Sequence, residues 1–127
     1  MSTLRSPLGR VRGLGSAKEG VAHWWAQRVT AVALVPLTLW FVVSVIALAG
    51  ASYDQALAFF AAPHRAVPML LLIAALFHHA QLGLQVVIED YVHQEGAKIA
   101  LLLLVKGLAI LLAALAGFAV LKLAFGG

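Results

Sequence analysis

The chain has 127 residues, of which 63% are hydrophobic and 11% are charged, whereas soluble domains carry about 25% charged residues. This excludes an ordinary soluble protein, and the length allows one compact domain at most. The absence of cysteine excludes thiolate metal sites, iron–sulfur ligation and disulfides within the chain. The formal net charge is +4, but the basic residues do not gather with exposed aromatics, so we expect no nucleic acid partner.

Residues 1–28 are expected to form a cytoplasmic N-terminal arm and an interfacial segment. The first fifteen residues are rich in Arg, Gly, Ser and Pro, which is typical of a flexible arm. Residues 20–28 place Trp24 and Trp25 beside Arg28, and such amphipathic rings settle in the headgroup layer of a membrane.

Residues 29–127 are expected to form a transmembrane anchor, because they contain three long apolar runs, about 29–49, 67–88 and 99–121. About 20 apolar residues are needed to cross a bilayer as a helix. The runs are continuous rather than alternating, which favours helices over a β-barrel, and the first is too long and starts too late for a signal peptide. The predicted fold class is therefore all-α integral membrane, with three transmembrane helices surrounded by membrane lipid.

The orientation follows from the distribution of positive charge. Five of the nine Lys and Arg residues precede the first run: Arg5, Arg10, Arg12, Lys18 and Arg28. The positive-inside rule then places the N-terminus in the cytoplasm and, after three crossings, the C-terminus on the opposite side.

The second run holds two adjacent histidines, His78 and His79, near its middle and Asp90 after its end. At 100° per residue, His79 and Asp90 lie within about 20° of the same helix face, about 16 Å apart along the axis, while His78 is offset by about 120°. Gly83 lies one turn from His79 on the same side. The missing side chain leaves room for a flat macrocycle or another helix backbone.

A histidine at mid-membrane has three interpretations. It can form a hydrogen bond to a neighbouring helix, or it can belong to a proton relay, for which Lys106 is the one further ionisable group at depth. It can also be an axial ligand of haem iron. Arg28 and His23, at the cytoplasmic end of the first helix, would then be placed to neutralise the haem propionates. For Lys106 we expect the side chain to snorkel towards the cytoplasmic surface.

Asp90 and Tyr91 close the second run and also have two interpretations. They are suited to a helix end at the membrane–water interface. They are equally suited to a quinone site, because a tyrosine hydroxyl can donate to a quinone carbonyl and a carboxylate can relay protons.

The pattern H-x3-G-x6-D-Y made by His79, Gly83, Asp90 and Tyr91 resembles that of the smaller membrane anchor subunit of succinate dehydrogenase. Residues 20–31 are similar to the segment that leads into the first of the three helices in that family. The resemblance covers approximately residues 20 to 121.

The resemblance implies that His79 is an axial ligand of haem b, with the second ligand supplied by the larger anchor subunit. It implies that Arg28 and His23 lie near a haem propionate, and that Tyr91 and Asp90 belong to a ubiquinone site. His78 departs from the family pattern.

The resemblance also implies the partners: a flavoprotein that oxidises succinate, an iron–sulfur subunit that passes electrons to ubiquinone, and a larger cytochrome b anchor. The chain itself would hold no catalytic residue and no succinate-oxidising site. No transit peptide is recognisable, which indicates a bacterial inner membrane.

Three alternatives stay open. The first is an anchor of the fumarate reductase type. The second is a purely structural anchor without haem. The third is a small transport component, in which His78, His79 and Lys106 would face one pore.

Overall fold

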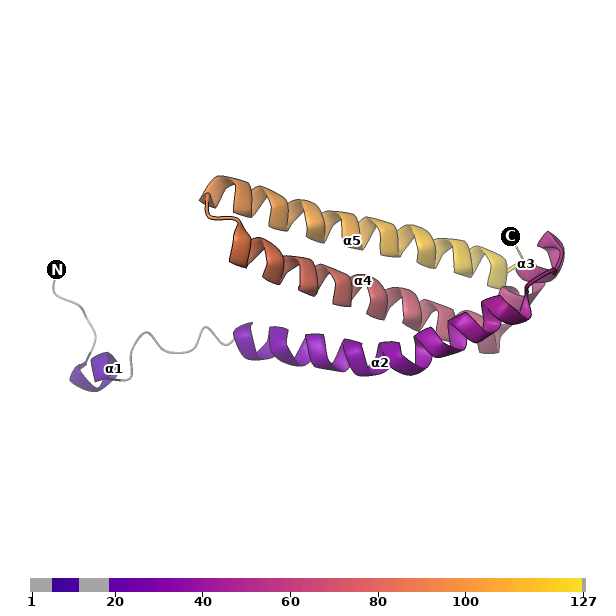
Figure 1. Ribbon diagram of the computed structural model, residues 1–127, viewed down its shortest axis with the longest axis horizontal. Coiled ribbons are helices and arrows are strands. Elements are labelled where there is room, and N and C mark those ends of the chain that lie inside the picture. Colours follow the sequence, from indigo (N-terminus) through magenta and orange to yellow (C-terminus); the bar gives the residue numbers. More distant parts are fainter. Residues whose placement is uncertain (1–5, 12–18, 127) are drawn as a thin grey trace.

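The computed structural model describes residues 6–11 and 19–126, which form helices and short connections without any strand (Figure 1). The helices are α1 (Pro7–Val11), α2 (Glu19–Ala47), α3 (Tyr53–Ala61), α4 (Pro63–Tyr91) and α5 (Glu95–Ala124). Within these residues three helices, α2, α4 and α5, are long and apolar enough to cross a membrane. The predicted fold class, all-α with three transmembrane helices, is confirmed.

The membrane helices extend beyond the apolar runs that predicted them. The interfacial segment 20–28 is continuous with the first span in one helix, α2, rather than separate from it. After Gly20 nothing in this segment breaks a helix, so the hydrogen-bond ladder continues past the lipid. The arm was expected to be flexible, yet its residues 7–11 form α1, which begins at Pro7 and has the Ser6 hydroxyl accepting from the Gly9 N–H at 3.1 Å. The arm's residues 1–5 and 12–15 lie outside the described residues.

Helix α4 lies between α2 and α5 and packs against both, whereas α2 and α5 do not contact each other (Figure 1). The membrane helices therefore form an open layer rather than a closed bundle. The small apolar core lies between α4 and α5, around Ala66, Ile73 and Val120, and the alanines Ala113 and Ala116 pack against it. Small residues at such a contact let two helix backbones approach closely.

Most large apolar side chains on α2 and α5 are exposed. In water such a surface would be strongly unfavourable, so it is suited to lipid or to a neighbouring subunit.

Helix α3 was not predicted, because it lies between the first two apolar runs. It begins with a capping box, in which the Ser52 hydroxyl accepts from the Gln55 N–H at 3.2 Å and the Gln55 side chain accepts from the Ser52 N–H at 2.9 Å. This S-x-x-Q spacing is a helix-start signal visible in the sequence. At the other end, the Arg65 guanidinium of α4 lies 3.8 Å from the centre of the Phe59 ring and thereby ties α3 to α4.

The start of α2 and the α4–α5 connection lie at one end of the layer, and α3 and the C-terminus lie at the other (Figure 1). This is the arrangement that three crossings require. Which end faces the cytoplasm stays a prediction from the positive-inside rule.

Candidate functional site

The two adjacent histidines of α4 face different sides of that helix. His79 lines a groove between α4 and α2, together with apolar residues such as Ala31 and Leu34. His78 lines a different groove, between α4 and α5, with Lys106. The separation of His78 from His79 that helix periodicity predicted is therefore confirmed, and His79 is on the side of α4 that faces α2.

His79 forms a hydrogen bond with Thr30 of α2. Its ring Nδ1 lies 3.0 Å from the Thr30 Oγ1, so the hydrogen bond to a neighbouring helix, one of the three interpretations of a mid-membrane histidine, is present. Within residues 19–126 this is the one hydrogen bond of the ring, and Nε2 has no protein partner. The histidine is thus held through one nitrogen while the other is available to a ligand.

A second groove between α2 and α4, of about 440 Å³, lies nearer the start of α2 and is lined by His23, Gln27, Arg28 and Gly83. The Nε2 of His23 and the Oε1 of Gln27 are buried without a hydrogen-bond partner among the described residues. Leaving a buried polar atom unsatisfied costs about 1–3 kcal/mol. These two atoms are therefore candidates for contacts with a group bound in the groove.

Arg28 lines this groove and contacts Trp24. The guanidinium carbon is 5.0 Å from the centre of the Trp24 ring, within the range of a cation–π contact. Trp25 meets the same ring edge to face, with 5.0 Å between the ring centres. The tryptophans predicted as interfacial anchors therefore also position the predicted propionate arginine.

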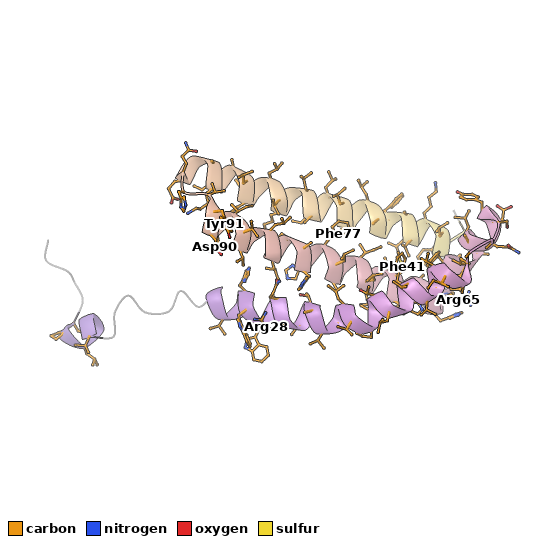
Figure 2. The ribbon with its side chains drawn as sticks, in the orientation of Figure 1. Arg28, Phe41, Arg65, Phe77, Asp90 and Tyr91 are labelled. Carbon is orange, nitrogen blue, oxygen red and sulfur yellow. The ribbon has the colours of Figure 1, made fainter. Side chains whose placement is uncertain are left out.

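Asp90 and Tyr91 end α4 at the same end of the layer as the start of α2, and Arg28 lies in the nearer half of α2 (Figure 2). Both side chains are exposed, Tyr91 to 77%, and neither lines the grooves described above. The fold thus brings His23, Arg28 and Gly83 to one groove between α2 and α4 and His79 to another groove between the same helices, while Asp90 and Tyr91 lie exposed at the end of α4.

Several polar residues near these grooves were not singled out by the sequence. Thr30 and Gln27 occupy the α2 side of the site, and their place in the segment leading into the first helix was the available signal. On the other side of α4, Gln81 donates to Gln85 at 3.3 Å and Gln85 donates to Glu89 at 2.9 Å.

The transport alternative required His78, His79 and Lys106 to face one pore. That alignment is not present, because His79 is on the α2 side of α4 while the other two line the α5 side. Within the described ranges, no three His, Cys, Asp or Glu side chains gather to hold a metal ion.

Comparison with known proteins places the chain among respiratory membrane subunits. A family model described as succinate dehydrogenase/fumarate reductase transmembrane subunit matches residues 2–120. The succinate dehydrogenase hydrophobic membrane anchor subunit of Rickettsia bellii is 34% identical over 107 residues, which cover 84% of this chain and 86% of that protein. The corresponding subunit of Paracoccus denitrificans is 40% identical over 86 residues, covering 68% of this chain and 67% of that protein.

A succinate dehydrogenase membrane anchor subunit of Reclinomonas americana is 32% identical over 96 residues, covering 73% of this chain and 80% of that protein. No solved structure gives a significant match.

Proposed function

Because the chain belongs to the succinate dehydrogenase/fumarate reductase transmembrane subunit family, we propose that its His79 is an axial ligand of haem b and that the chain forms one wall of a ubiquinone-reduction site. It is a membrane anchor subunit of succinate dehydrogenase, a multi-pass protein of a bacterial inner membrane that associates with the other subunits of its complex. In the proposal those subunits are a flavoprotein, an iron–sulfur protein and a larger cytochrome b anchor, and the start of α2 faces the cytoplasm.

The state of His79 is the observation that carries the haem proposal. The ring is fixed at Nδ1 by Thr30 at 3.0 Å, and its other nitrogen has no protein partner among the described residues. A metal-ligating histidine normally has this arrangement, with one nitrogen on the metal and the other held by the protein.

The groove beside His79 has the chemistry that a haem needs. The buried, unpartnered Nε2 of His23 and the guanidinium of Arg28 would hold the propionates, and Gly83 leaves space where a side chain would otherwise stand. When bound, a bis-histidine haem supplies one-electron redox chemistry. This chain's own part would be to ligate the iron, neutralise the propionates and exclude water through the apolar wall that includes Leu34.

The quinone site is proposed at the cytoplasmic end of α4. There the Tyr91 hydroxyl would donate to a quinone carbonyl, while Asp90 would pass protons from the aqueous side. Since both side chains are exposed in this chain alone, partner subunits would supply the remaining walls of the pocket. Electrons would come from succinate oxidation in the partners, as no succinate-oxidising site is proposed here.

The test is a pair of variants, His79→Ala and His78→Ala, in the complete complex purified in mild detergent. The haem content per flavin is read from the reduced-minus-oxidised visible spectrum. We expect His79→Ala to abolish or strongly lower the haem signal and His78→Ala to retain it, because only His79 faces the α2 groove. Haem lost from His78→Ala but kept in His79→Ala would overturn the assignment.

A further inference from the structure

We propose that Thr30 sets the tautomer of His79, so that Nδ1 carries the ring proton and Nε2 is left as the lone-pair nitrogen. Thr30 thereby acts as a positioning residue for the metal ligand. The tautomer assignment rests on the contacts within this chain, and only its consequence for the iron rests on the proposed function.

The assignment follows from counting donors and acceptors around the Thr30 hydroxyl. Its Oγ1 lies 2.7 Å from the Ala26 carbonyl oxygen, 3.1 Å from the Gln27 carbonyl oxygen and 3.0 Å from the His79 Nδ1. A hydroxyl has one hydrogen to donate and two lone pairs that accept, and carbonyl oxygens only accept. The shortest contact therefore takes the hydrogen, and the hydroxyl donates to Ala26.

Two cases remain for the ring. If Nδ1 is protonated, it donates to a free lone pair of the Thr30 oxygen, and each group has a partner of the right kind. If Nδ1 is unprotonated, it and the two carbonyls compete for a single hydrogen, and lone pairs face one another at about hydrogen-bond distance. That arrangement leaves a partly buried ring nitrogen without a donor, which is unfavourable, so the Nδ1–H tautomer is favoured.

The local structure holds the hydroxyl in this role. Thr30 lies on α2 one turn after Ala26, where a threonine can return its hydroxyl hydrogen to the i−4 carbonyl. Its branched Cβ restricts χ1 to few rotamers. The oxygen is thereby aimed by the helix itself and presents a lone pair towards α4. The apolar residues of the adjoining groove, among them Ala31 and Leu34, lower the local dielectric and strengthen the bond.

The hydrogen bond from His79 to Thr30 would affect both the orientation of the His79 ring and its strength as a metal ligand. A histidine that donates from one nitrogen binds a metal more strongly through the other, and loss of the outer partner typically lowers metal affinity about 10- to 100-fold. A more basic ligand favours the ferric state. Removing the Thr30 hydroxyl should therefore weaken haem binding and raise the haem midpoint potential; a tenfold preferential loss for the ferric form would correspond to about 59 mV.

The test uses three variants of the full chain. Thr30→Val keeps the shape and removes the hydroxyl, and Thr30→Ser keeps a hydroxyl. Thr38→Val is the matched control, because Thr38 lines the same groove on α2 but makes no hydrogen bond to His79.

The first readout is independent of haem and activity. The ring 15N shifts of the haem-free chain, labelled at histidine, report which nitrogen is protonated, and His79→Gln identifies the His79 signals. We expect the Nδ1–H tautomer in the wild type, in Thr30→Ser and in Thr38→Val, and its loss or mixing in Thr30→Val. An Nε2–H tautomer in the wild-type chain, or an unchanged tautomer in Thr30→Val, would overturn the proposal, even if Thr30→Val assembles poorly.

The second readout is the midpoint potential and haem occupancy of the assembled complex. A higher potential in Thr30→Val, with wild-type values in Thr30→Ser, supports the positioning role. Failure of the proposed haem ligation can be distinguished from failure of the tautomer assignment. In the first case His79→Ala would retain haem, while the 15N result on the haem-free chain would be unaffected.

Discussion

Gly83 offers a direct measure of whether the groove between α2 and α4 holds a bound group. In this chain a Cβ at position 83 would lie 3.9 Å from the Gln27 Nε2, which is an ordinary contact distance. The chain alone therefore accommodates Gly83→Ala without a clash. Because alanine is a better helix former than glycine, we expect the haem-free variant to gain up to about 1 kcal/mol in free energy of unfolding.

The assembled complex should respond in the opposite direction. If a haem fills the groove, the added methyl overpacks the site, which typically costs about 1–3 kcal/mol. At 1.4 kcal/mol per tenfold, haem affinity should fall about fivefold to a hundredfold. Gly83→Leu, whose side chain would occupy the groove, should remove haem altogether.

Two measurements separate these effects. Detergent-induced unfolding of the haem-free chain, followed by circular dichroism, gives the stability, and the haem-to-flavin ratio of the complex gives the occupancy. Gly107→Ala is the matched control, because Gly107 is also within a membrane helix and a Cβ there meets nothing within 4 Å. Wild-type haem content in Gly83→Leu would refute the idea that this groove accommodates the haem.

Three further predictions concern the ends of the helices. Tyr91→Phe removes one hydrogen bond, worth about 0.5–1.5 kcal/mol. It should lower kcat/KM for ubiquinone up to about tenfold, while succinate oxidation by a soluble artificial acceptor continues. Asp90→Asn should slow quinone turnover. Equal loss of both activities in Tyr91→Phe would indicate a structural role, and wild-type quinone turnover in Asp90→Asn would remove the proton relay. Ser52→Ala should destabilise α3 by about 1 kcal/mol through loss of its N-cap, which would be measured as faster hydrogen exchange of the α3 amides. Unchanged exchange would show that packing alone stabilises α3.

Helix periodicity explains why part of the site was predictable. His78 and His79 are adjacent, so about 100° around the helix separates them, and the structure places them in different grooves on the two sides of α4. Periodicity gives relative angles within one helix and not the rotation of that helix against its neighbours. For this reason the contact between His79 and Thr30 could not be predicted, although both residues lie in segments that the sequence marked as informative.

The helix ends were less predictable than the spans. An apolar run marks the part of a helix that needs lipid, while the helix continues wherever the next residues tolerate it, as residues 20–28 do at the start of α2. Helix α3 begins at a short capping signal at Ser52, and a search for long apolar runs does not detect such a signal. The quinone residues illustrate another limit, since Asp90 and Tyr91 are placed at a helix end by their position in the sequence but their pocket depends on other subunits.

The sequence by itself determined that this protein spans a membrane three times as helices. Apolar runs of that length leave lipid as their environment, and in lipid the backbone must satisfy its own hydrogen bonds. Only the tertiary structure decided that α4 lies between the other two spans and turns His79 towards α2. That rotation depends on how side chains from distant segments pack together, such as Ile73 against Val120, and no single helix contains this information.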